Sequence, residues 1–361
     1  MTGEPYILWL QDCDRSQLPR VGGKNASLGE MLQARVRVPP GFAITTDAYW
    51  EFIRQAGLDR EIQRQLDCLD PNDVTAIEQA SLAIRQMMSR AAIPPAIEAA
   101  IQDAYACLAA ECGLRDLPVA VRSSATAEDL PNASFAGQQE TTLWVCGPAM
   151  VMIRTAICWS SLFTPRAIAY RMQMGFPHQK VLISVGIQKM VNARTAGVMF
   201  TLNPSNGDRS TVAIDASWGL GETVVSGMVT PDNFLVDKVT RAIVRRKASP
   251  KLLEYVPNPA ARRAEIYDVP PERQNCLCLS EAEVHELVEL AECIEGYYHL
   301  PMDIEWAIDA DLPLPASVMT LQCRPETVWS RQPPKRVVKP LGGALDYVVA
   351  NLLTGVRTRK S

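Results

Sequence analysis

Hydrophobic positions in the first half of the chain predict a helix-rich segment framed by short strands. Apolar residues recur at helical spacing from Ile97 to Cys112, and Gly113 follows as a helix end. We expect helices to dominate after Val38–Ile44 up to about residue 113, and again over Ala149–Met174, where Arg166 and Arg171 are expected on a solvated face. Short apolar runs predict the strands of this half, which are Tyr6–Leu10, Val38–Ile44, Pro118–Val121 and Val181–Gln188.

The second half predicts strands joined by turns, together with one long helix. Ser280 and Glu283 have the spacing of a capping box, so a helix is expected to begin there and to run to Gly296. The predicted strands and hairpins are Ala196–Leu202, Thr211–Ser217, Asn233–Lys247, Met302–Ile308 and Ser317–Arg324.

The composition is that of a globular protein, and it also indicates the cellular compartment and which kinds of partner are not supported. The chain has 361 residues, which is enough for two lobes, and its 47% hydrophobic and 21% charged residues are ordinary values. A net charge of -4 gives no support to nucleic-acid binding. No apolar run reaches the length of a membrane span. The ten cysteines include no C-x-x-C pair, so we expect a reducing, cytoplasmic location.

The stretch Val119–Thr142 carries the strongest chemical signal. An apolar strand runs into Arg122, and the small and hydroxyl residues Ser123–Ala127 are expected to open a loop behind it. Backbone N–H groups of such a loop can approach a polyphosphate closely, and a guanidinium at a strand end matches phosphate oxygens. The alternative is a surface loop of small residues that binds no ligand.

A glycine turn at Gly22–Gly23 leads into a predicted helix with Lys24 at its start. A lysine in this position can contact an anion held at the positive end of the helix. The spacing is not that of a Walker A loop, because Asn25 stands where serine or threonine is required. The alternative is an ordinary solvated lysine.

The last predicted strand pair brings acids and hydrogen-bond donors to one face. Asp303 and Glu305 are two residues apart, as are Gln322 and Arg324, so each pair shares a face of its strand. Carboxylate and amide oxygens suit Mg²⁺ on a nucleotide, and a guanidinium can pair with its phosphates. The alternative is a cross-strand salt-bridge ladder that faces solvent.

Seven segments of the chain resemble a known family. They are GGKNASLGEM, VAVRSSATAEDLPNASFAGQQET, SLFTPRAIAYR, AGVMFTLNP, SWGLGETVVSG, PMDIEW and LQCRPET, in this order. Over about residues 1–330 they are similar to the N-terminal ATP-binding region of phosphoenolpyruvate synthase, pyruvate phosphate dikinase and rifampicin phosphotransferase. The resemblance implies an ATP-grasp fold in which two α+β lobes, residues 1–190 and 191–330, clamp ATP.

The resemblance implies phosphate contacts for residues along the whole chain. Lys24, Arg122 and Arg324 are expected to contact the phosphates and to act in catalysis by offsetting their charge. Gly137 and Thr141 are expected to belong to the loop that covers the phosphates.

Further residues are assigned to the nucleoside and the metal by the same resemblance. Gln188 is expected on the adenine side, where a strand leads into Gln-Lys-Met-Val, and Glu222 is expected to contact the ribose or the second lobe. Glu305 and Gln322 are the implied Mg²⁺ ligands, with Asp303 as a lesser candidate. ATP and Mg²⁺ are therefore the expected cofactors.

Members of this family carry a phosphorylatable histidine on a separate domain, in a Gly-Gly-x-x-x-His context. His178, His285 and His299, the three histidines of this chain, lack that context. The resemblance therefore implies a split enzyme, in which a partner subunit bears the histidine and receives the β,γ-pyrophosphoryl group while AMP leaves. We expect a hetero-oligomer in which this chain activates ATP and supplies no covalent nucleophile.

The acceptor of the phosphoryl group would bind outside this chain. The chain is similar to the ATP-binding subunit of the phenylphosphate synthases, a split branch of the family, so phenol is the expected acceptor, with phenylphosphate, AMP and phosphate as products. One alternative is the ATP-binding part of a phosphoenolpyruvate synthase or antibiotic phosphotransferase with another acceptor. An alternative of another class is a nucleotide-sensing subunit without catalysis.

Residues 331–361 form a basic tail with a different pattern. Pro333, Pro334 and Pro340 predict a linker. The residues that follow predict one apolar helical stripe: Leu345, Val348, Val349, Leu352 and Leu353. This stripe is expected either to dock on the partner subunit or to pack back on the chain's own lobe.

Overall fold

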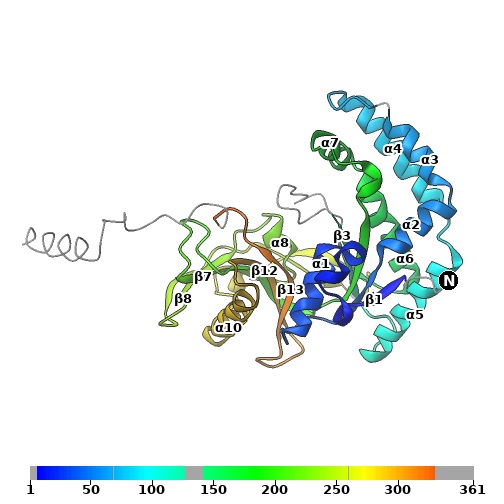
Figure 1. Cartoon of the computed structure of the whole chain (residues 1–361). Helices are drawn as coiled ribbons and strands as arrows, with labels where there is room; N and C mark the ends of the chain where they lie inside the picture. The colour runs from blue at the N-terminus through cyan, green and yellow to red at the C-terminus, as the bar shows by residue number, and fades with distance from the viewer. Residues whose placement is uncertain (1–5, 68, 127–140, 259, 330–361) are drawn as a thin grey trace, which may run out of the picture. The chain divides into compact units, whose positions relative to one another are not determined.

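The computed structural model describes residues 6–67, 69–126, 141–258 and 260–329 (Figure 1). The predicted loop around Gly137 and the predicted tail helix lie outside the described residues. The described residues up to Pro325 form one compact unit, and those from Glu326 on are not part of it. All described helices and strands belong to this compact unit.

The first described sheet has five strands in the order β1-β2-β5-β3-β4, and each neighbouring pair is antiparallel. The four strands predicted in this half all form. The bounds are β1 Ile7–Trp9, β2 Gly41–Ile44, β3 Val119–Ala125, β4 Thr141–Val145 and β5 Ile183–Lys189.

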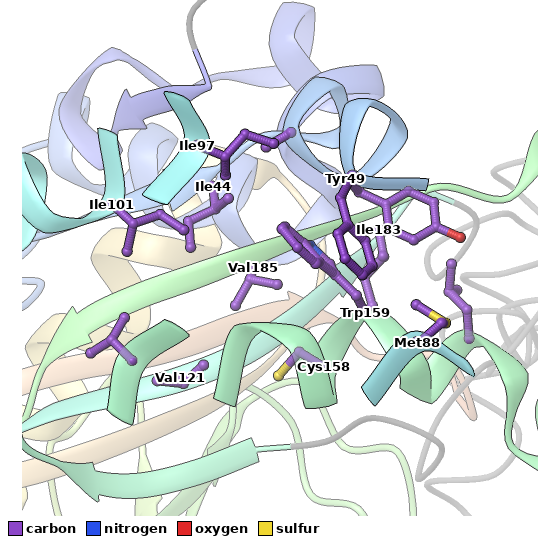
Figure 2. Packing of buried hydrophobic residues seen from close by; sticks show 14 of the residues in the cluster. Ile44, Tyr49, Met88, Ile97, Ile101, Val121, Cys158, Trp159, Ile183 and Val185 are labelled. Carbon is purple, nitrogen blue, oxygen red and sulfur yellow. The ribbon is translucent and has the colours of Figure 1, made fainter. Parts of the chain in front are cut away.

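Apolar residues from several helices of the first half form one buried cluster with this sheet, some against its strands and others against neighbouring helices (Figures 1 and 2). Figure 2 shows Trp159 and Cys158 facing Val121, Val185 and Ile183 across the core. The ring of Phe52 stacks on Trp159 with centroids 5.0 Å apart. The helices are α1 Leu18–Gln33, α2 Thr46–Gln55, α3 Leu58–Asp67, α4 Val74–Arg90, α5 Pro95–Glu111, α6 Pro148–Ser160 and α7 Pro165–Gln173.

Strand β3 extends further than the sequence indicated. Its ladder with β5 continues past Arg122 to the pair Ala125–Ile183, so Ser123–Ala125 are strand residues and the prediction of a loop directly after Arg122 was wrong. Their small side chains lie in a crowded interior, since Ser123 and Ser124 are each 1% exposed. Their backbone N–H groups are therefore part of the sheet and do not form a phosphate-binding loop.

The second described sheet has six strands in the order β13-β12-β6-β7-β8-β9, again antiparallel throughout. The predicted strand pairs of this half are confirmed, with some shifts at their ends. The bounds are β6 Ala193–Phe200, β7 Thr211–Trp218, β8 Asp232–Asp237, β9 Ile243–Lys247, β12 Met302–Asp309 and β13 Val318–Pro325.

Helix α10 (Glu281–Tyr298) lies against β12 and β13. The predicted capping box of Ser280 and Glu283 is present. The helix does not end at Gly296 as predicted. It continues to Tyr298, and His299 adopts the left-handed conformation that ends it, with φ at 55°.

Four short elements of the second half were not predicted, because their sequences lack a clear apolar period. They are α8 Glu222–Val225, α9 Pro271–Gln274 and the hairpin strands β10 Leu253–Asn258 and β11 Arg263–Asp268. The hairpin is joined to the segment after β7, since the Leu220 N–H donates to the Tyr255 carbonyl at 2.7 Å.

Helix α1 contacts strands of both sheets, namely β3, β5 and β13. Its polar residues bond it to the second sheet and to helix α10. The Ser27 hydroxyl donates to the Cys323 carbonyl at 3.1 Å, and the Tyr298 hydroxyl donates to Glu30 at 2.9 Å. Because Ser27 lies about one turn after Lys24, these bonds set the position of Lys24 relative to β13.

The first sheet takes its strands from residues before 190, and the second takes its strands from residues after 192. Both sheets belong to one compact unit, so the division into lobes at residue 190 stays a prediction. Among the described residues, no helix combines the length and the apolar character that crossing a bilayer requires.

Gly22→Ala is expected to destabilise the fold by about 2–4 kcal/mol, through left-handed strain and steric overlap. Gly22 has φ of 70°, and an added Cβ would lie 2.3 Å from the Ser124 carbonyl oxygen. Urea unfolding measures the effect. Gly57→Ala is the matched control, because Gly57 has φ of 65° and open space around it, so it tests strain alone. An equal loss of unfolding free energy in the two variants would contradict the steric argument.

Candidate nucleotide-binding site

A pocket of about 520 Å³ lies between strands of the two sheets. The first sheet contributes residues of β3 and β4, and the second contributes residues of β6, β12 and β13. Seven of the nine predicted site residues line this one pocket, although they are up to 300 positions apart in the chain. They are Lys24, Arg122, Thr141, Glu222, Glu305, Gln322 and Arg324.

Lys24 is placed by a kink in α1. The non-helical conformation of Gly22 divides the helix, so Lys24 lies in the first turn of its second segment. The next residue, Asn25, is buried and holds this turn to the first sheet: its side-chain amide donates to Val21 at 2.9 Å and to the Ser184 hydroxyl at 3.2 Å. The turn is thereby a rigid support for the lysine.

Arg122 links the two sides of the pocket. In β3 it pairs with Thr141 of β4 and with Gly186 of β5, which fixes its backbone in the middle of the first sheet. Its Nη1 donates to the Leu321 carbonyl of β13 at 2.9 Å. Its buried Nε has no hydrogen-bond partner among the described residues, so part of the guanidinium's donor capacity is available for a ligand.

The β12–β13 hairpin brings the predicted acids, amide and guanidinium together. Asp303 is opposite Arg324, and Glu305 is opposite Gln322. Arg324 donates to the Asp303 carboxylate at 2.8 Å, so the alternative of a cross-strand ion pair holds for these two residues. Glu305 and Gln322 line the pocket, and the register shifts directly after Glu305, a feature common beside functional sites.

Gln188 does not line the pocket. Its side chain is buried, and its amide donates to the Pro39 carbonyl at 3.3 Å. The segment that follows it, Lys189–Val191, lines the pocket instead. The residues after Gln188 in the Gln-Lys-Met-Val segment therefore line the pocket, while the Gln188 side chain does not, and a contact of this segment with adenine stays a prediction.

Sequence reasoning missed the apolar lining of the pocket. Small and apolar residues from both sheets contribute to it: Ala120, Leu143, Ala193, Ala196, Leu220 and Ala307. A usable signal was the period of two along β3, because Ala120 and Arg122 share a strand face. An apolar wall beside cationic side chains suits a nucleotide, which has a flat base and charged phosphates.

The donor set at the hairpin fits a metal ion that is held mainly by phosphates. Among the described residues, no group of three or more histidine, cysteine, aspartate or glutamate side chains could hold a metal by itself. Because Asp303 is paired with Arg324, the hairpin offers a metal ion one carboxylate, from Glu305, and one amide oxygen, from Gln322. This is the sparse protein contribution that Mg²⁺ on nucleotide phosphates usually receives.

The three histidines lie away from the pocket lining. His285 is on α10 beside Glu281, and His299 caps that helix. His178 accepts a hydrogen bond from Arg171, and burial together with the nearby guanidinium lowers the pKa of His178 to about 4. The expectation that none of the three is the family's phosphorylatable histidine stays a prediction.

The two sheets, the pocket between them and its lining define an α+β nucleotide-binding fold. The comparison with known proteins identifies it further. Residues 18–342 match the family described as "Pyruvate phosphate dikinase, AMP/ATP-binding domain", and the chain belongs to this family.

Similar curated proteins are phosphoenolpyruvate synthases by name. The chain is 46% identical to the probable enzyme of Staphylothermus marinus, with 90% of this chain and 42% of that protein covered. It is 45% identical to the enzyme of Pseudomonas aeruginosa, with 90% and 42% covered, and 43% identical to that of Escherichia coli, with 91% and 42% covered. The chain thus spans less than half the length of these relatives.

Proposed function

We propose that this chain is the ATP-binding part of a dikinase-type phosphotransferase of the phosphoenolpyruvate synthase kind, with the ATP-grasp arrangement of its two sheets. The observation that carries the proposal is the single pocket in which Lys24, Arg122 and Arg324 meet Glu305 and Gln322. The names of the similar proteins support phosphoenolpyruvate as the product more than phenylphosphate. We therefore prefer pyruvate over phenol as the acceptor.

In this proposal the chain accelerates phosphoryl transfer by positioning and charge neutralisation. A histidine that is none of the three in this sequence, on a further domain or a partner subunit, attacks the β-phosphorus of ATP, the bond from the β-phosphorus to the α,β-bridging oxygen breaks, and AMP leaves. Water then releases phosphate, and the phosphohistidine passes its phosphoryl group to the acceptor. Lys24, Arg122 and Arg324 offset the charge that moves onto the leaving AMP.

Glu305 and Gln322 would hold Mg²⁺, which supplies charge neutralisation on the phosphate oxygens when bound. The Arg324–Asp303 ion pair orients the guanidinium at the rim of the pocket. Arg122 has a second effect, because its bond to Leu321 fixes one sheet relative to the other. The apolar lining beside Lys189–Val191 would take the adenine base.

We expect AMP to form from ATP and Mg²⁺ only when a histidine-bearing domain or partner subunit is supplied to this chain. The measurement follows AMP and phosphate together with phosphoenolpyruvate or phenylphosphate, with pyruvate or phenol as acceptor. Phosphoenolpyruvate formation would support the preferred acceptor, and phenylphosphate formation would restore phenol. If the chain binds ATP tightly but no AMP forms with any histidine-bearing part or acceptor, the nucleotide-sensing alternative is favoured.

A further inference from the structure

A second cavity, of about 420 Å³, shares no lining residue with the nucleotide pocket. It is bounded by α2, by α3, by Phe163 just before α7, and by the segment from His178 to Leu182 that leads into β5. Much of its wall is apolar or aromatic: Tyr49, Trp50, Ile53, Phe163, Val181 and Leu182. This size and lining are typical of a site for a small organic molecule.

Arg171 lies directly behind this wall and is 1% exposed, although the sequence favoured a solvated position for it. Its Nε donates to His178 at 2.9 Å, and its guanidinium carbon lies 5.6 Å from the ring centroid of Phe163. Among the described residues, its Nη1 and Nη2 have no hydrogen-bond partner, and no carboxylate forms an ion pair with it. A buried charge of this kind is costly until an anion offsets it.

His178 connects this charge to the cavity. Because its Nδ1 accepts the Arg171 Nε–H, the neutral ring carries its proton on Nε2. That Nε2–H has no acceptor among the residues described, and His178 itself lines the cavity. The guanidinium on the far side of the ring polarises this N–H and makes it a strong donor for an anion.

The other charged groups on the cavity wall balance one another. Arg60 and Arg64 offset Asp59 and Asp67 in formal charge on the wall, although Arg64 also pairs with Glu61 and Asp67 lies near enough to His178 to raise its pKa. Arg171 behind the wall adds one positive charge that no ion pair offsets among the described residues. A single positive charge behind an apolar wall favours a ligand with one negative charge and an apolar body over a small, multiply charged anion.

We propose that this cavity binds a small apolar monocarboxylate, whose carboxylate accepts the His178 Nε2–H bond and offsets the buried charge of Arg171. The aromatic and aliphatic wall residues contact the body of the ligand. The site is separate from the proposed nucleotide function, since its groups do not line the nucleotide pocket.

The test compares benzoate with its neutral analogue benzamide by saturation-transfer NMR on the full chain. Benzoate is expected to bind about tenfold or more tightly than benzamide, the margin of a charge-assisted hydrogen bond. Arg171→Met and His178→Phe should each remove this preference. Arg166→Met, a change at an exposed position of the same helix, should keep it. Calorimetric titration with ATP should give the same affinity for all of these variants, and this separates the two proposals.

Arg171→Met is expected to fold, because it replaces an unpaired buried charge by an apolar side chain of similar length. If Arg171→Met does not fold, the comparison of benzoate with benzamide is made on His178→Phe. The proposal is overturned if benzoate does not bind, if benzamide binds equally well, or if the preference survives both substitutions. It is also overturned if inorganic phosphate displaces benzoate at equal concentration, since the site would then be a general anion site.

Discussion

Arg122→Ala is expected to lower the rate of AMP formation about 10²–10³-fold, the usual cost of losing one preorganised charge-stabilising contact. The guanidinium is fixed in β3 between β4 and β5, and its Nε is buried without a partner among the described residues. Arg122→Lys should recover only part of the rate, because an ammonium lacks the planar fork that matches phosphate oxygens.

The assay follows AMP release with the histidine-bearing part supplied. The unfolding free energy should fall by only about 1 kcal/mol, the value of the lost bond to the Leu321 carbonyl. Arg166→Ala, at an exposed position of α7, is the matched control and should leave the rate unchanged. A near-normal rate in Arg122→Ala, with the control also normal, would remove Arg122 from the site.

Glu305→Gln is expected to lower AMP formation about 10²-fold and to raise the Mg²⁺ concentration needed for half-maximal rate about tenfold or more. The substitution keeps the size of the side chain and removes only its charge. Because Asp303 of the same hairpin is paired with Arg324, loss of the Glu305 charge leaves the amide of Gln322 as the main remaining protein ligand.

A titration of the rate against Mg²⁺ at fixed ATP measures this effect. Glu289→Gln, at an exposed position of α10, is the control for loss of one acid and should behave as the unchanged protein does. An unaltered Mg²⁺ requirement in Glu305→Gln would contradict the assignment of Glu305 as a metal ligand.

The sequence predicted most helices and strands, because amphipathic periods and caps are local properties. The Ser280–Glu283 capping box and the β12–β13 pair formed as expected. The errors fell where neighbours distant in the chain decide the outcome. Ser123–Ala125 look like loop residues, yet the ladder with β5 makes them strand. Hairpin β10–β11 had no clear period and was missed.

For the site, the sequence by itself determined which residue types could bind phosphate and metal, and the resemblance supplied their identities. Only the tertiary structure decided that Lys24, Arg122, Glu305, Gln322 and Arg324 line one pocket while Gln188 is buried away from it. Residue spacing reports which side chains share a local face. It does not report which faces from remote segments meet, since that depends on how the two sheets pack.

The clearest example is the helix that carries Arg171. Its sequence suggested a solvated arginine, because charged residues on short helices usually face water. In the fold, Phe163 and His178 cover the guanidinium, and Tyr49 of the distant helix α2 shares their wall. Burial of one polar side chain is set by what packs over it, and that information is absent from its own segment of the chain.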